Sequence, residues 1–168
     1  MSTDSSYVID KSDWGPGPWQ EEPDKLQWRT QAGLPGLIVR SNSHLGNLCG
    51  YAAVNPGHPL YGKGYNEVDL NEPPHGDLTF AGRCMEDGPV CHVPESGEPA
   101  DVWWFGFDCG HYLDLMPGMR AYERRSGFPP DLLERLESEQ TYKNVDYVRR
   151  EVEVLAAQLA EAQDKDAD

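Results

Sequence analysis

The sequence predicts an α+β fold, in which a small antiparallel β-sheet with long Pro/Gly-rich loops carries a C-terminal helix packed on one face. Three observations lead to this prediction. Short apolar runs bounded by turn residues are typical of strands, and a single strong helical period stands near the C-terminal end. The 17 glycines and 14 prolines favour short elements joined by loops. The length of 168 residues fits one domain with a single core.

Residues 1–23 are predicted to form a mostly irregular N-terminal arm, because they are polar and interrupted by prolines and glycines. Trp14 and Trp19 are expected to dock this arm on the domain, since an indole left in water forgoes roughly 2–3 kcal/mol of burial energy. The domain itself is predicted to span residues 24–162. It is expected to begin with one or two helical turns over residues 24–31.

The next segments predict a β-hairpin. Residues 37–40 and 48–54 are apolar and short enough for strands, and residues 41–47 between them form the turn. Residues 55–74 are rich in proline and glycine and predict a long ordered loop. Loops of this length often carry function.

Two more strands are predicted at residues 78–81 and 102–107, with a loop over residues 85–100 between them. The second strand is apolar on both faces, which favours a central place in the sheet. After Pro117 the pattern changes, and Pro130 is expected in the first turn of a short helix that extends through Glu137.

The clearest period belongs to a helix predicted at about residues 144–162. Its apolar residues step by three and four along one stripe: Val145, Val148, Val152, Leu155, Leu159 and Ala162. Such a stripe is most often buried against the sheet of the same chain. The spacing also fits a short coiled-coil seam, so the protein is expected to be a monomer or a dimer through this helix. Residues 163–168 predict an acidic, frayed tail.

The chain is acidic, with 14 lysines and arginines against 29 aspartates and glutamates and a net charge of −15. Direct binding to nucleic acid or to anionic lipid is therefore not expected. The acidity favours solubility, or else a surface that acts as a decoy for a nucleic-acid-binding protein. The first residues carry no secretory signal and no run of about eighteen apolar residues occurs, which predicts a cytoplasmic protein with reduced cysteines.

Between His75 and Asp114 the chain gathers three of its five histidines and three of its four cysteines, which makes this region the candidate site. A thiolate-rich set has the donor types of tetrahedral zinc, although its first two cysteines are farther apart than in usual zinc knuckles: Cys84, Cys91, Cys109 and His111. An oxygen-rich set suits an open, hydrolytic metal site: His75, Asp108, His111 and Asp114. Zinc is the only cofactor that these patterns indicate.

Two other interpretations use the same region. Cys49 becomes a nucleophile if one of the histidines His44, His75 or His111 approaches its thiol; a cysteine in a strand is otherwise a small core residue. Binding without chemistry uses aromatic faces for stacking and polar side chains for hydrogen bonds to a planar, nucleotide-like ligand. The residues predicted for that ligand are Tyr51, His75, Thr79, Trp104, Phe107, Asp108 and His111, with Trp103 and Tyr112 as further stacking faces.

Several segments together resemble a set of uncharacterised small proteins of actinobacterial phages and related bacterial genomes. The segments that carry the resemblance are residues 33–40, 48–51, 56–59, 75–82 and 103–111, and the similarity spans roughly residues 14–160. One departure is Asp77, where many relatives are expected to have glycine. The resemblance implies a phage accessory protein in the cytoplasm of an infected bacterium, and it carries over no catalytic residue.

In that context the leading hypothesis is a protein that binds or sequesters a host factor or a small nucleotide-like ligand, in a counter-defence role. The cations available to such a ligand are Arg40, Lys63, Arg83 and Arg120. The first alternative is a metal- or cysteine-dependent hydrolase centred on His75, Asp108 and His111. The second is the acidic decoy.

Overall fold

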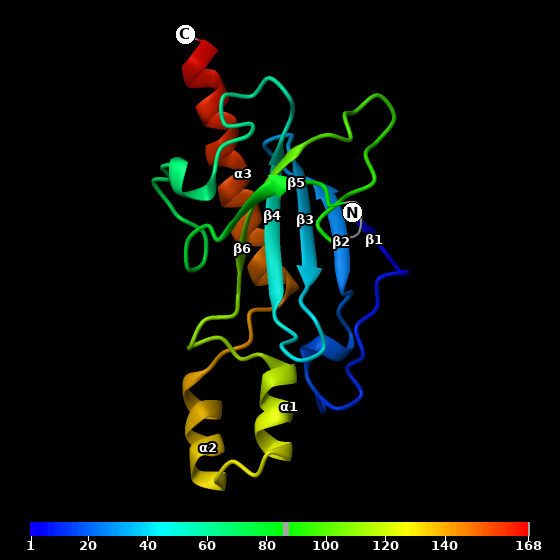
Figure 1. Cartoon of the computed structure of the whole chain (residues 1–168), viewed down its shortest axis with the longest axis vertical. Coiled ribbons are helices and arrows are strands. Elements are labelled where there is room, and N and C mark those ends of the chain that lie inside the picture. The colour runs from blue at the N-terminus through cyan, green and yellow to red at the C-terminus, as the bar shows by residue number, and fades with distance from the viewer. Residues whose placement is uncertain (86–87, 168) are drawn as a thin grey trace.

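The computed structural model describes residues 1–85 and 88–167, and of residues 165–167 only the backbone. In this part of the chain one six-stranded antiparallel sheet is combined with three α-helices, so the predicted α+β class is confirmed (Figure 1). The strands, in the spatial order β1-β2-β3-β4-β6-β5, are β1 (Ser2–Thr3), β2 (Lys25–Arg29), β3 (Pro35–Arg40), β4 (Leu48–Val54), β5 (Phe80–Arg83) and β6 (Trp103–Asp108). The helices are α1 (Pro117–Arg125), α2 (Pro130–Glu139) and α3 (Val145–Ala167), with short 3-10 turns at Pro18–Gln20 and Tyr65–Glu67.

The two faces of the sheet bury different residues, because side chains alternate along each strand. Ile38 of β3 pairs with Gly50 of β4, which pairs with Phe107 of β6. Gly50 leaves room here, since a Cβ at this position would lie 2.8 Å from a methyl group of Val152 in α3. The buried stripe of α3 belongs to the same apolar cluster as these strand residues: Val148, Val152, Leu155 and Leu159. The helix therefore packs on the sheet.

The opposite face carries Leu37, Tyr51 and Trp104, which form a second apolar cluster. Trp103 and Trp104 thus point to opposite sides of β6, as the alternation of a strand requires. Trp104 is fully buried, whereas Trp103 is half-buried and its Nε1 donates to the Lys63 carbonyl at 2.9 Å.

The predicted hairpin and the two later strands are confirmed, with ends displaced by one or two residues. The helical turns predicted for residues 24–31 are wrong, because this segment is β2. Leu26 and Trp28 are buried while their neighbours are more exposed, a period of two that suits a strand pairing with β3. Helix α1 was not predicted; it begins at Pro117, whose fixed φ suits a first helical position. Helix α3 continues to Ala167, beyond the predicted end at about residue 162; Asp168 lies outside the described residues.

The N-terminal arm docks through its indoles, as expected. Trp14 and Trp19 are both buried, and Trp14 Nε1 donates to the Ser43 carbonyl at 3.1 Å. The arm is not wholly irregular, since it contributes β1 to the edge of the sheet and one 3-10 turn. None of the helices in the described part of the chain is long and apolar enough to cross a bilayer.

A buried charged network lies between the arm and the sheet, centred on the fully buried Arg40. Its Nε donates to Asp24 Oδ1 at 2.7 Å, and its Nη1 donates to Tyr142 Oη at 2.8 Å and to the Gly46 carbonyl at 3.0 Å. The Lys11 ammonium lies 2.7 Å from the same Asp24 oxygen. Arg40 is therefore a structural cation and is not available to a ligand, in contrast to the prediction.

The cysteines depart from the prediction of reduced thiols, because Cys84 and Cys91 are joined by a disulfide. The chain reverses between them: the Met85 amide donates to the Val90 carbonyl and the Gly88 amide to the Met85 carbonyl. This turn brings the two Cα atoms to 4.6 Å, within the range that a disulfide spans. Residues 86–87 of the predicted 85–100 loop lie outside the described residues.

His92, next to this disulfide, gives the fold a predicted pH dependence. Its ring packs edge-on against Trp104 at 5.2 Å, and burial lowers its pKa from the ordinary 6.5, with Arg29 and Lys25 acting in the same direction. The unfolded chain therefore binds a proton at this histidine more readily than the folded chain does. Stability from this group is present above pH 6.5 and is lost as the pH falls toward the lower folded pKa.

We expect urea unfolding to give a smaller free energy at about pH 5.5 than at about pH 7.5, and a His92→Gln variant to lose less over the same interval. His44→Gln, at an exposed histidine, is the control. Equal pH dependence in all three proteins would contradict the assignment.

Candidate metal centre

The candidate site is assembled from two loops and the start of α3. His75 lies in a turn closed by a 2.7 Å hydrogen bond from the Asp77 amide to the Pro74 carbonyl. His111 follows the last residues of β6, and a further turn, with the Asp114 amide donating to the His111 carbonyl at 2.9 Å, places Asp114 beside it. The turn containing His75 and the segment after β6 thus present their side chains to one another.

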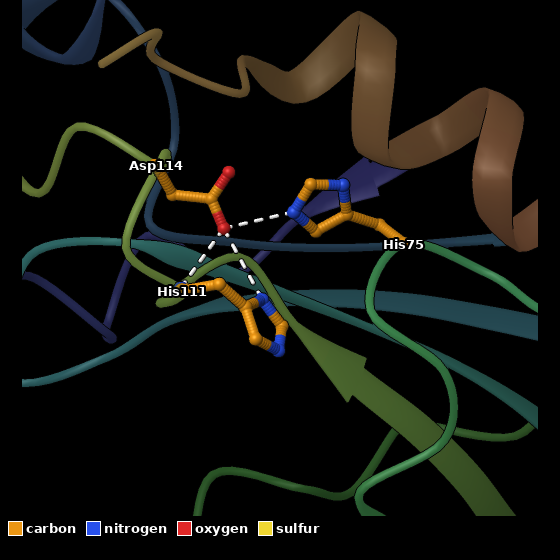
Figure 2. A group of neighbouring side chains, drawn as sticks. All are labelled: His75, His111 and Asp114. Atoms are coloured by element: carbon orange, nitrogen blue, oxygen red, sulfur yellow. Dashed lines mark hydrogen bonds and ion pairs between the residues drawn. The ribbon is translucent and has the colours of Figure 1, made fainter. Parts of the chain in front are cut away.

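The two imidazoles converge on one carboxylate oxygen. Asp114 Oδ2 accepts from His75 Nε2 at 2.8 Å, from the His111 amide at 3.0 Å and from His111 Nδ1 at 3.3 Å. Figure 2 shows both rings directed at this oxygen. The three ligand atoms lie within 4.8 Å of one another, and this is the only such group of three or more metal-ligating side chains in the described part of the chain.

Burial is graded across the cluster. The Asp114 side chain is 2% exposed, that of His75 17% and that of His111 41%. The carboxylate is therefore held inside the protein, while the His111 side of the cluster opens to solvent. An open side is what a catalytic metal site needs, because a water or a substrate must reach the metal.

Lys143, two residues before α3, and Tyr147, in its first turn, support the cluster. The Tyr147 hydroxyl lies 2.8 Å from His75 Nδ1, and the Lys143 ammonium lies 3.0 Å from Asp114 Oδ1. Thr141 sets the position of Lys143, since it pairs with the segment that carries Asp114. When His75 donates from Nε2 to the carboxylate, Nδ1 accepts from Tyr147; when Nε2 is free to ligate, Nδ1 donates to the same hydroxyl. The tyrosine thus serves both tautomers and fixes the ring.

The same contacts keep Asp114 ionised. Burial alone would raise its pKa, but hydrogen bonds from the His111 amide, His75 and Lys143 outweigh burial and lower the pKa below its usual value. An ionised carboxylate accepts hydrogen bonds or ligates a cation through its lone pairs.

Gly76 is the residue that lets the two histidines approach. Its φ of +68° lies in the left-handed region, and a Cβ built on it would overlap the His111 ring. The next residue, Asp77, is the one non-glycine residue with positive φ in the described chain, at +71°. Glycine adopts this conformation without strain, which gives a physical reason for expecting glycine at this position in relatives.

The structure corrects both predicted metal sets. The disulfide consumes the thiols of Cys84 and Cys91, so the thiolate-rich set with Cys109 and His111 is not formed. Three of the four residues in the oxygen-rich set do converge. Asp108 does not belong to the cluster, because its carboxylate accepts from Thr79 Oγ1 at 3.1 Å and from the Gly110 amide at 3.0 Å.

The free cysteines are poorly suited to nucleophilic catalysis. Burial, with the nearby Asp108 carboxylate, raises the pKa of the Cys49 thiol to about 12. Burial also raises the pKa of Cys109. A thiol with a raised pKa has almost no thiolate at neutral pH, so the cysteine-dependent mechanism considered from the sequence loses its nucleophile.

Three of the predicted stacking faces are in the core, whereas Trp103 is half-buried and Tyr112 is 63% exposed. Tyr51, Trp104 and Phe107 are all buried, and Tyr51 packs edge-on against Phe80 at 5.5 Å. These rings stabilise the sheet and offer no open face to a planar ligand. Of the seven residues predicted to bind such a ligand, His75 and His111 are in the metal-ligating cluster, while Thr79 and Asp108 bond to each other.

Sequence reasoning missed Lys143, Tyr147 and the role of Gly76. Lys143 and Tyr147 both lie outside the region where histidines and cysteines gather, and neither has a local pattern that points to His75. The comparisons add no guide to function, since no family model, curated protein or solved structure matches this chain.

Proposed function

We propose that this protein binds one divalent transition metal, zinc by donor type, through His75 Nε2, His111 Nδ1 and Asp114 Oδ2, and that it is a metal-dependent hydrolase. The observation that carries the proposal is the convergence of these three ligand atoms within 4.8 Å. Two imidazoles and one carboxylate form a donor set used by catalytic zinc sites, with a fourth position left for water.

The distances from the two imidazole nitrogens to Asp114 Oδ2 are close to those of a metal site. Tetrahedral zinc, with bonds of about 2.0–2.1 Å, sets its ligand atoms about 3.3–3.4 Å apart. His111 Nδ1 is already 3.3 Å from Asp114 Oδ2, and His75 Nε2 at 2.8 Å has to retreat by about half an ångström. Lys143 holds Oδ1, so Asp114 is set up to ligate through Oδ2 alone.

The roles of the residues follow from these contacts. A bound zinc ion would lower the pKa of its water to about 7 and so supply hydroxide at neutral pH. The His111 side of the cluster is open to solvent, whereas Lys143 contacts the second carboxylate oxygen of Asp114, Oδ1. Tyr147 fixes His75 through Nδ1, the kind of supporting contact whose loss typically weakens metal binding about 10–100-fold.

The test combines zinc binding with hydrolysis. We expect native mass spectrometry to show one zinc per chain, and calorimetry to show that His111→Ala and Asp114→Asn each weaken zinc binding at least about 100-fold, whereas His44→Ala does not. Asp108→Asn separates the observed cluster from the set predicted by sequence, and it should leave zinc binding intact.

Hydrolysis of 4-nitrophenyl acetate should depend on added zinc and fall with the same variants. Ferrous iron accepts the same donor set, and elemental analysis of the purified protein distinguishes the two metals. A chain that binds zinc no better than His111→Ala, or that hydrolyses the ester equally well with chelator present, would refute the proposal.

A further inference from the structure

An apolar groove runs from the candidate metal centre along the hairpin of α1 and α2. Figure 1 shows this hairpin at one end of the molecule, away from α3. The groove has a volume of about 500 Å³, in the range of small-molecule sites. Its apolar lining comes from both helices and from the segments that flank them: Tyr112, Met116, Met119, Tyr122, Phe128, Leu132 and Leu136.

The polar groups around the groove are only partly paired with one another. Arg120, buried beneath the hairpin, donates from Nη2 to Gln140 Oε1. Its Nε and Nη1 have no hydrogen-bond partner in the described part of the chain and lie 3.7 Å and 3.6 Å from the carboxylates of Glu123 and Glu137. Gln140 Nε2 in turn donates to the Tyr112 carbonyl at 2.8 Å. Arg135 is the one exposed cation among the lining residues. Recognition in the groove therefore rests on apolar contact.

Gly110 and His111 also line the groove. His111 is also the most exposed member of the metal-ligating cluster, so it belongs to both sites. A molecule lying in the groove would therefore contact His111, one of the three residues that would hold the metal. Aromatic rings that stay exposed in the groove, such as Tyr122 at 55%, are what a ligand would cover.

We propose that this groove binds the acyl chain of a carboxylic ester, so that the scissile carbonyl lies beside His111; this inference rests on the proposed hydrolase function. The oxygen of water forms a new bond to the carbonyl carbon, and the bond from that carbon to the alcohol oxygen breaks. The alcohol oxygen keeps the electron pair and takes a proton from the water, which leaves one acid and one alcohol.

Charge argues for an acyl chain over a nucleotide. The chain carries a net charge of −15, and the groove offers one exposed cation, Arg135. A phosphate-bearing ligand would need several cations or free amide donors at its site. A neutral ester with an aliphatic chain needs only the apolar walls.

The test compares 4-nitrophenyl acetate with 4-nitrophenyl hexanoate in the presence of zinc. We expect kcat/KM to be at least about tenfold higher for the hexanoate, because each added methylene gains contact with the groove. Tyr122→Ala should lower kcat/KM for the hexanoate several-fold more than it lowers kcat/KM for the acetate. Tyr65→Ala is the matched control, since Tyr65 is 48% exposed and lies outside the groove.

The outcomes separate this inference from the function on which it rests. Hydrolysis of both esters at equal kcat/KM would overturn the acyl groove and leave the hydrolase function standing. Zinc binding without hydrolysis of either ester would overturn the acyl groove as well. If the chain binds no zinc, the proposed hydrolase function is refuted. Binding of hexanoate itself then tests the groove. Chemical shift changes at the Met116 and Met119 methyl groups with hexanoate but not acetate would support the groove, and no change would refute it.

Discussion

Replacing Gly76 with alanine is expected to weaken zinc binding about 10–100-fold, whereas replacing Gly57 with alanine leaves it unchanged. Both glycines have positive φ, +68° and +94°, so both substitutions strain the backbone by roughly 1–2 kcal/mol. Only at Gly76 does the new methyl group meet a side chain, because it would overlap the His111 ring. Nothing lies within 4 Å of a Cβ at Gly57.

The pair of variants therefore isolates the steric effect on the cluster from the strain common to both turns. Zinc calorimetry measures the first, and urea unfolding of the same samples measures the second. We expect similar losses in unfolding free energy and very different losses in zinc affinity. If Gly57→Ala weakens zinc binding as much as Gly76→Ala does, the approach of the two histidines across Gly76 is not what builds the site.

Replacing Asp24 with alanine is expected to lower the free energy of unfolding by about 3–5 kcal/mol. The substitution removes the carboxylate that accepts from Arg40 Nε and leaves a fully buried guanidinium with an unpaired donor. It also removes the acceptor of the Ile9 amide at 2.8 Å, which ties the N-terminal arm to the sheet. Urea denaturation monitored by tryptophan fluorescence gives the number directly.

Asp13→Ala provides the control, because Asp13 pairs with Arg125 at 2.8 Å but both side chains are mostly exposed. An exposed pair of this kind contributes about 0–1 kcal/mol. Comparable losses from Asp13→Ala and Asp24→Ala would show that burial of the Arg40 network contributes little to stability.

The sequence was informative where structure is local. The hairpin of β3 and β4 follows from two apolar runs and a polar turn, and the stripe of α3 follows from its period. β2 was misread because alternation over five residues is short, and its strand character depends on pairing with β3. The disulfide was missed because the lack of a secretory signal led to the expectation of reduced cysteines, although the run Asp87-Gly88-Pro89 between Cys84 and Cys91 is a turn pattern.

The candidate site was predictable only in part. His75, His111 and Asp114 stand in the region that the sequence singled out, and the spacing of the last two allows a shared turn. Asp108 is an aspartate like Asp114, but its carboxylate accepts hydrogen bonds from Thr79 and Gly110 and does not join the cluster. Lys143 and Tyr147 depend on how α3 docks, which no local pattern encodes. The role as a phage accessory protein stays a prediction from resemblance.

The scatter of the site along the chain has a consequence for biosynthesis. His75, Asp114 and Tyr147 come from the middle and the last third of the sequence, and Tyr147 contacts His75 across 72 positions. The ribosome adds Tyr147 to the chain long after His75. A nascent chain that still lacks α3 therefore lacks the contact between Tyr147 and His75. A polypeptide that ends before residue 143 would keep the three proposed ligands and lack the contacts of Lys143 and Tyr147, so we expect it to hold metal more weakly.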